Sequence, residues 1–155
     1  MTTASLPVPT KDLATAILGI WKLKSRIDID GNGQRRIDPG LGADPLGIVC
    51  FAPGCFAAQF MKRDRSAGPA APALPQAVNN SNAVGGYDAY FGSYELDAAT
   101  GAITTLLEGS ITPSNVGTRF VRDIRVVENE LIIQLATTAP DGAAVTRTLR
   151  WSRLM

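Results

Sequence analysis

With 155 residues, of which 45% are hydrophobic and 19% charged, the chain is long enough to fold around one substantial core. Its net charge of +1 and the absence of any run of Lys and Arg argue against an electrostatic footprint for nucleic acid, so we expect no nucleic-acid partner. The sequence contains no histidine, which removes the commonest general base and metal ligand; we expect neither a metal site nor a Ser-His-Asp triad.

The beginning of the chain lacks the features of a targeting segment. No basic stretch precedes an apolar run in residues 1–18, and nowhere do 18 apolar residues follow one another. We therefore expect a cytoplasmic protein with no membrane partner. In that reducing environment Cys50 and Cys55 are expected to remain free, packed thiols, although a tight turn at Pro53-Gly54 would also allow a disulfide between them.

The first predicted elements are a short helix and a long strand. Thr10 is a suitable N-cap for a helix that ends near Leu18 and would cover one end of the fold. Residues 19–30 then alternate with a period of two, which is typical of a half-buried strand. The expected buried row is Trp21, Leu23, Ser25, Ile27 and Ile29, and the expected solvent row is Lys22, Lys24, Arg26, Asp28 and Asp30.

Further strands joined by turns make up most of the remaining chain. Residues 63–82 are rich in proline and alanine and lack an apolar face, so we expect a long loop or lid there, followed by a brief helix over residues 83–91. Nine strands in all predict an antiparallel meander, and closure into a barrel would give the long strand partners on both edges. The predicted strands cover residues 19–30, 34–37, 46–51, 55–62, 93–97, 102–112, 118–127, 131–138 and 143–154.

Several separated motifs in this chain resemble those of one family. The motifs are Gly19-Ile20-Trp21-Lys22-Leu23, Asp44-Pro45-Leu46-Gly47, Ala58-Gln59-Phe60-Met61 with Arg65, Ala89-Tyr90-Phe91-Gly92-Ser93-Tyr94-Glu95, Glu108-Gly109-Ser110, Val116-Gly117-Thr118, Arg122 and Trp151-Ser152-Arg153. In this order and spacing they are similar to the lipocalin-like domain family of small bacterial and fungal proteins. The resemblance implies a single antiparallel barrel of eight to ten strands with an internal cavity over residues 19–155, preceded by an N-terminal arm and short helix over residues 1–18.

The resemblance implies a small-molecule cavity without specifying a reaction. Related barrels serve both as carriers and as cyclases or isomerases, and a fold alone does not decide between these functions. Thr105-Leu106 stands where members of the family often have histidine, so histidine-based chemistry is not implied for this chain.

A charge pair is the main candidate for chemistry. If Thr112 pairs with Thr118, the register places Glu108 opposite Arg122. Arg122 alternates with apolar residues on its strand, so this pair would lie inside the barrel. It is then either a structural ion pair or a site in which Arg122 binds a carboxylate, enolate or carbonyl oxygen and Glu108 orients the ligand or transfers a proton.

Other residues are candidates for the same cavity. Tyr94 should point inward, where its hydroxyl would contact either a ligand, as a third catalytic candidate, or a backbone carbonyl. Gln59 stands in a row with Ala57 and Met61 that we also expect to face inward. Gln59, Tyr90 and Arg147 each have a structural alternative, which we favour for Tyr90 as core packing and for Arg147. The ligand-binding candidates are Gln59, Tyr90, Phe120, Leu135 and Arg147.

The assumed register and the barrel closure have further consequences. The register would point Ile103, Leu107 and Ile111 outward, where a helix or a second subunit would have to cover them, so a homodimer is an alternative to a monomer. Closure would bring the strands of Trp21 and Trp151 together, and the resemblance implies that Arg153 or Arg150 stacks on a tryptophan ring.

Two functions follow from these expectations. We favour a cofactor-independent isomerase, cyclase or lyase that acts on a hydrophobic carbonyl-bearing metabolite, because an ionisable pair would face the cavity. The alternative is a non-catalytic carrier of a small hydrophobic ligand, which the missing histidine favours. In both cases the expected partner is a small hydrophobic molecule, and no cofactor is expected.

Overall fold

The computed structural model describes residues 10–65 and 77–155. This part of the chain begins with a helix, α1 (Thr10–Ala16), and a short 3-10 helix, η1 (Pro113–Asn115), lies between two later strands. The strands are β1 (Gly19–Asp30), β2 (Arg35–Arg36), β3 (Leu46–Ala52), β4 (Cys55–Met61), β5 (Tyr87–Asp97), β6 (Ala102–Ser110), β7 (Arg119–Val127), β8 (Glu130–Thr138) and β9 (Ala144–Arg153). The described residues therefore form an all-β fold with little helix, as predicted.

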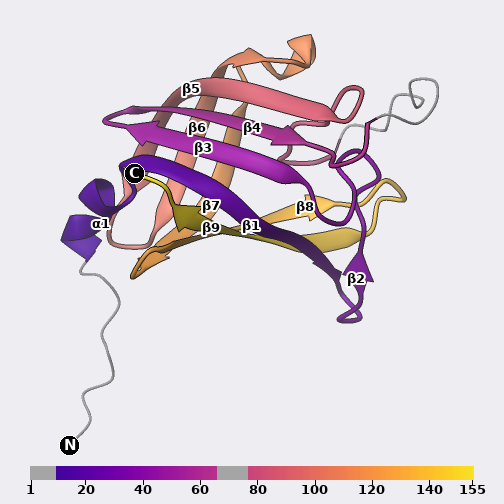
Figure 1. The fold of residues 1–155 in the computed structure, drawn as a ribbon, viewed down its shortest axis with the longest axis horizontal. Coiled ribbons are helices and arrows are strands. Elements are labelled where there is room, and N and C mark those ends of the chain that lie inside the picture. Colours follow the sequence, from indigo (N-terminus) through magenta and orange to yellow (C-terminus); the bar gives the residue numbers. More distant parts are fainter. Residues whose placement is uncertain (1–9, 66–76) are drawn as a thin grey trace, which may run out of the picture.

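The strands close into an antiparallel barrel. From β3 to β9 each strand pairs with the next, and β1 joins the two ends of this series by pairing with both β3 and β9. The short strand β2 adds to β1 outside the ring of eight. Figure 1 shows α1 near the C-terminus at one end of the barrel and β2 at the other end. The predicted closed meander is confirmed. Neither of the described helices is long and apolar enough to cross a bilayer.

The pairing of β1 with β9 brings the strands of Trp21 and Trp151 together, as predicted. Trp21 and Trp151 are almost completely buried, at 0% and 1% exposed. The guanidinium carbon of Arg153 lies 4.1 Å from the centre of the Trp21 ring, which identifies Arg153 as the stacking arginine. Arg153 also donates a 2.9 Å hydrogen bond to the carbonyl of Leu18, so one side chain connects the barrel seam to the segment that follows α1.

A bulge in β1 reverses the predicted faces of the second half of this strand. The register against β9 shifts between Leu23 and Ser25, so Lys24 is an extra residue without a partner in β9. One extra residue moves a period-two pattern by one step and turns every later side chain to the opposite face. The prediction that Arg26 and Asp28 lie in solvent is therefore wrong: these side chains point into the barrel and are 7% and 6% exposed.

The pairing of β6 also differs from the prediction, and β6 has a bulge against β5 at Glu108. Glu108 has no partner in β5, and a Cβ at Gly92 on β5 would lie only 1.8 Å from the carbonyl oxygen of Leu106, so the close approach of the two strands requires glycine. Arg122 pairs with Ile103 rather than with Glu108, and the predicted register between β6 and β7 is wrong.

This register also buries residues that were expected outside. Ile103 and Leu107 are 2% and 1% exposed and belong to the core, so the prediction that they point outward is wrong. Ile111 lies beyond the end of β6 and is partly exposed. Because the two core residues are already covered, the structure removes the reason for which a homodimer was an alternative to a monomer.

The segment before β5 differs from the prediction as well. Gly85 and Gly86 adopt positive φ angles of 59° and 79° and form a turn, after which Tyr87 pairs with Met61 and begins β5. The predicted helix over residues 83–91 is wrong, because the free edge of β4 provides backbone partners for this stretch. Residues 66–76 of the predicted lid lie outside the described residues, and residues 77–82 run as an irregular segment against the barrel.

The two cysteines are free thiols, as predicted. They lie on the two strands of the hairpin formed by β3 and β4, but the register pairs Cys50 with Ala57 and Cys55 with Ala52. Cys50 is half-buried, whereas Cys55 is exposed, so the expectation that both thiols are packed is wrong for Cys55.

Candidate functional site

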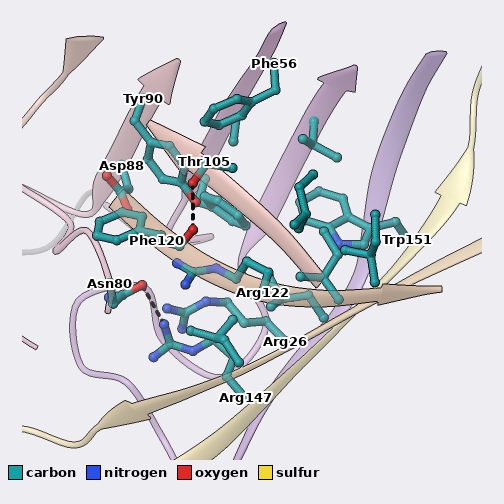
Figure 2. A pocket seen from close by; sticks show the side chains of 18 of the residues that line it. Arg26, Phe56, Asn80, Asp88, Tyr90, Thr105, Phe120, Arg122, Arg147 and Trp151 are labelled. Atoms are coloured by element: carbon teal, nitrogen blue, oxygen red, sulfur yellow. Dashed lines mark hydrogen bonds between the residues drawn. The ribbon is translucent and has the colours of Figure 1, made fainter. Parts of the chain in front are cut away.

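The inward faces of the barrel strands enclose a small cavity of about 60 Å³. Aromatic and aliphatic side chains form much of its lining, including Phe56 and Phe60 of β4. Polar and charged side chains form the remaining part: in Figure 2 Arg26, Arg122 and Arg147 lie close together, and Trp151 lies on the far side of the pocket. Asn80, Asp88 and Thr105 complete the polar lining. The cavity thus has an apolar region and a region rich in positive charge.

Two of these arginines are held by carboxylates. Arg147 of β9 donates to both carboxylate oxygens of Asp28, at 2.8 and 3.0 Å, and to the side-chain oxygen of Asn80 at 2.8 Å. Arg26 of β1 donates a 2.9 Å hydrogen bond to Asp38, and this pairing holds the pKa of Asp38 below its ordinary value although burial raises it. The bulge in β1 makes this network possible, because it turns Arg26 and Asp28 inward.

Arg122 of β7 is different, because no carboxylate of the described residues lies within ion-pair distance of it. Its guanidinium donates a 3.2 Å hydrogen bond to the carbonyl of Val121 and lies 4.9 Å from the centre of the Phe120 ring. Burial lowers the pKa of Arg122 to about 10; Tyr90 opposes this effect and Arg147 adds to it. Arg122 is therefore still a cation at neutral pH, in a largely apolar cavity.

Asp88 of β5 contributes a buried carboxyl group to the same cavity. It is 3% exposed, and burial raises its pKa to about 6, although a hydrogen bond from Ser81 acts in the opposite direction. The Ser81 hydroxyl donates to Asp88 at 2.9 Å, and the side-chain amide of Asn115 donates to the Ser81 hydroxyl at 3.2 Å. A chain of three buried polar side chains thus fixes the orientation of this carboxyl group.

The indole nitrogen of Trp151 is a further polar group in the cavity wall. Trp151 is 1% exposed and lines the cavity, and its N–H has no hydrogen-bond partner among the described residues. Buried donors are nearly always paired in folded proteins. An acceptor atom on a bound molecule would satisfy this donor.

Five of the residues selected from the sequence meet at this cavity. Arg122 comes from β7, and its side chain is buried as the alternation along that strand predicted. The other four are ligand-binding candidates, and the structure supplies an ion-pair partner for one of them, Arg147, which is the structural role that we favoured. These four are Tyr90, Phe120, Leu135 and Arg147.

Three selected residues lie elsewhere. Glu108 is exposed on the outer side of the bulge in β6, so its expected position inside the barrel is wrong. Gln59 is also exposed, where it accepts a hydrogen bond from Tyr87; Phe56 and Phe60 form the inward row of β4 in its place. The Tyr94 hydroxyl donates a 2.9 Å hydrogen bond to the carbonyl of Ala52, which is the structural alternative for this residue.

Two charged residues of the cavity lining were missed, Asp88 and Arg26. Asp88 could have been found by extending the inward row of Tyr94 backward with a period of two, through Gly92 and Tyr90. The alternation of β1 did not identify Arg26, because the bulge that turns it inward depends on the pairing of β1 with β9. No group of metal-binding side chains occurs among residues 10–65 and 77–155.

Comparison with known proteins agrees with this architecture. The model of the lipocalin-like domain family matches residues 18–154, which include every barrel strand. No curated protein matches the chain. Since the match covers most of the 155 residues, the chain belongs to the lipocalin-like domain family.

Proposed function

We propose that the barrel binds a small, mainly apolar molecule that presents a carboxylate, enolate or carbonyl oxygen to Arg122. The observation that carries this proposal is the burial of Arg122 without a carboxylate partner in the described part of the chain. A buried charge is costly unless it is paired, and an anionic oxygen from a ligand would supply the missing charge. The apolar body of the ligand would contact the aromatic lining of the cavity.

The cavity volume limits the size of the ligand. Its volume of about 60 Å³ is smaller than that of an engineered protein cavity of about 150 Å³ that binds benzene. A ligand much larger than a few heavy atoms must therefore displace lining side chains. Displacement of Arg122 would disturb its hydrogen bond to the carbonyl of Val121, its hydrogen bond with the Tyr90 side chain and its contact with the Phe120 ring.

Calorimetric titration with cyclopentanecarboxylate tests this function, since the probe combines one anionic group with a compact apolar ring. We expect R122M to bind the probe about 10–100-fold more weakly, because hydrogen bonds to charged groups contribute about 1.5–3 kcal/mol. R125M is the matched control: Arg125 lies on the same strand but is exposed, and its removal should leave the affinity unchanged. R122M should fold at least as stably as the wild type, because it removes a buried charge.

Two results would contradict this function. Equal affinity of R122M and wild type for the carboxylate would show that Arg122 does not contact the ligand. Equal binding of cyclopentylamine, a cation of similar size, would show that the cavity does not select for an anionic oxygen.

Catalysis is a second candidate function. The same cavity supports either a carrier or a cofactor-independent isomerase, cyclase or lyase, since each needs an apolar site with an oxygen-binding cation. Glu108 and Tyr94 no longer support the enzyme, because neither lines the cavity. Asp88 favours the enzyme instead, because it adds a titratable carboxyl group to the lining that contains Arg122.

A further inference from the structure

We propose that Asp88 is the acid-base residue of this cavity and that the protein transfers protons on a bound ketone with an acidic α-hydrogen. The proposal rests on the proposed function, because the ketone oxygen must lie against Arg122. It adds a class of substrate and the group that removes the hydrogen. The product would be an isomer of the same ketone.

The positions of two side chains are the first support. Asp88 and Arg122 come from β5 and β7, and both line the same cavity inside the barrel. In Figure 2 the Asp88 carboxyl and the Arg122 guanidinium lie on the same side of the pocket, with the rings of Tyr90 and Phe120 beside them. A small ketone could therefore place its oxygen at the cation and its α-carbon toward the carboxyl group.

The buried hydrogen-bond chain is the second support. Ser81 and Asn115 are 2% and 4% exposed, and they come from the segment before β5 and from η1. The 2.9 Å hydrogen bond from Ser81 fixes one oxygen of Asp88, and the 3.2 Å hydrogen bond from Asn115 fixes Ser81. A catalytic base needs this kind of fixed orientation, so Ser81 and Asn115 are positioning residues in the proposal.

The charges that face Asp88 allow it to act near neutral pH. Arg26 of β1 lowers its pKa, Asp38 in the loop after β2 raises it, and burial outweighs both. The resulting pKa of about 6 leaves the carboxyl group ionised, yet able to hold a proton, at neutral pH. Tyr90, the neighbouring phenol on β5, has a pKa that burial raises further, so it remains protonated in this range.

The proposed reaction begins when the Asp88 carboxylate removes a proton from the carbon between a carbonyl group and a carbon–carbon double bond. The electron pair of that C–H bond forms a new double bond, and the carbonyl π electrons move onto the oxygen, where Arg122 stabilises the dienolate. Protonated Asp88 then gives its proton to the far carbon of the original double bond, and the carbonyl group forms again. All atoms and electrons of the substrate are retained, so no co-reactant is required.

Isomerisation of cyclopent-3-en-1-one to its conjugated isomer tests the proposal, because the conjugated product absorbs ultraviolet light more strongly. We expect the wild type to accelerate the reaction over buffer and D88N to lose at least about 100-fold of that acceleration, the usual contribution of a general base. D97N is the matched control, since Asp97 lies on the same strand but is exposed, and it should keep the wild-type rate.

Binding of the saturated ketone cyclopentanone, measured by NMR on the same proteins, separates failure of the reaction from failure of the site. A wild type that binds cyclopentanone but does not accelerate isomerisation would overturn the Asp88 proposal and leave the binding function intact. Acceleration by D88N equal to the wild type would also overturn it. Absence of both binding and acceleration would overturn the binding function together with the proposal.

A second variant, S81A, distinguishes positioning from a purely structural role. The hydrogen bond from Ser81 lowers the pKa of Asp88, so its removal should move the midpoint of the pH–rate profile to higher pH. If Ser81 only supported the fold, the rate would fall without a change of the midpoint, and the proposed role of Asp88 as the titrating base would be wrong. This measurement also decides the question if D88N does not fold.

Discussion

Arg122 and Asp88 show how burial acts on single ionisable residues of opposite sign. Burial disfavours the charged form of both groups, so it lowers the pKa of the arginine to about 10 and raises the pKa of the aspartate to about 6. At neutral pH both groups are nevertheless largely charged. The cavity therefore holds a cation that can bind an oxygen and a carboxylate that can exchange a proton.

Asp88 should make the stability of the protein depend on pH. Its pKa rises from an ordinary value of 3.8 to about 6 on folding, so the folded state binds more protons than the unfolded state between these values. This stabilisation is complete below about pH 4 and is lost as the pH rises through about 6, and it amounts to about 3 kcal/mol. We expect the stability of D88N relative to wild type to increase by roughly this amount from about pH 4 to about pH 7.

Urea denaturation at several pH values would measure this change, and D97N would show the contribution of an exposed carboxyl group on the same strand. Comparison of variants is needed because Asp38, which faces Asp88, has a lowered pKa and acts in the opposite direction. If the difference between D88N and wild type did not vary with pH, Asp88 would not be the raised group.

Two bulges determine how the elements present their side chains. The bulge at Lys24 turns Arg26 and Asp28 into the barrel, whereas Glu108 lies outside because it follows the inward residue Leu107, at the position where β6 bulges against β5. In β1 one unpaired residue exchanges the inner and outer rows of the remaining strand. The polar region of the cavity is thus a consequence of strand pairing and not only of composition.

The ion pair between Asp28 of β1 and Arg147 of β9 should be strongly coupled. Both side chains are nearly buried, at 7% and 4% exposed, and they pair directly across the two strands. R147M leaves the buried carboxylate of Asp28 without its cation, so we expect it to cost about 3–5 kcal/mol, whereas D28N should cost less because Arg147 keeps a 3.6 Å ion pair with Asp38. The double variant should cost less than the sum of the single changes, with a coupling energy above about 1 kcal/mol in a thermal or urea denaturation cycle.

The exposed pair of Arg36 and Asp141 provides a control cycle, since its side chains are 32% and 60% exposed. We expect a coupling energy of about 0–1 kcal/mol for this pair. A coupling energy no larger at Asp28 and Arg147 than in this control would mean that the inward turn of β1 does not bring these two charges together in solution.

On the scale of the whole molecule, stability depends on closure of the first strand onto the last. Arg153 of β9 stacks on Trp21 of β1 and donates hydrogen bonds to the carbonyls of Ala16 and Leu18. Arg153 therefore connects the seam between β1 and β9 to the end of α1. Opening of the seam would expose both tryptophans, because Trp151 lies on β9 opposite Leu23 of β1.

We expect unfolding followed by tryptophan fluorescence and by far-ultraviolet circular dichroism to give the same midpoint, since the seam and the sheet form one cooperative barrel. R153M should lower both midpoints together, by the equivalent of about 1–3 kcal/mol, because it removes the ring contact and two hydrogen bonds. R150M is the control: Arg150 is exposed and paired with Glu130 at the surface, and its loss should cost about 0–1 kcal/mol. An earlier fluorescence transition in the wild type would contradict cooperative closure.

Local pattern predicted most of the strands and their order, although the first half of β5 was predicted as a helix, and the family resemblance added the expectation of a single barrel. Period-two alternation located β1, β7, β8 and β9 within a few residues, and the turn residues between them separated the strands. The same alternation placed Arg122 inside, because Phe120 and Ile124 beside it are apolar and no bulge interrupts β7. These features depend on side-chain period and on turn chemistry, both of which can be read over a few consecutive residues.

Only the tertiary structure decided which charged groups meet in the cavity. The positions of the bulges at Lys24 and Glu108 depend on the partner strand, and Gly92 allows the second because a Cβ would contact the carbonyl oxygen of Leu106. A shift by an odd number of residues exchanges the two faces of a strand: the five-residue error in the pairing of Arg122, with Ile103 instead of Glu108, put Glu108 into the predicted site, and the one-residue bulge at Lys24 kept Arg26 out of it. Side-chain alternation is a local property of the chain, whereas register is set by pairing between strands distant in sequence.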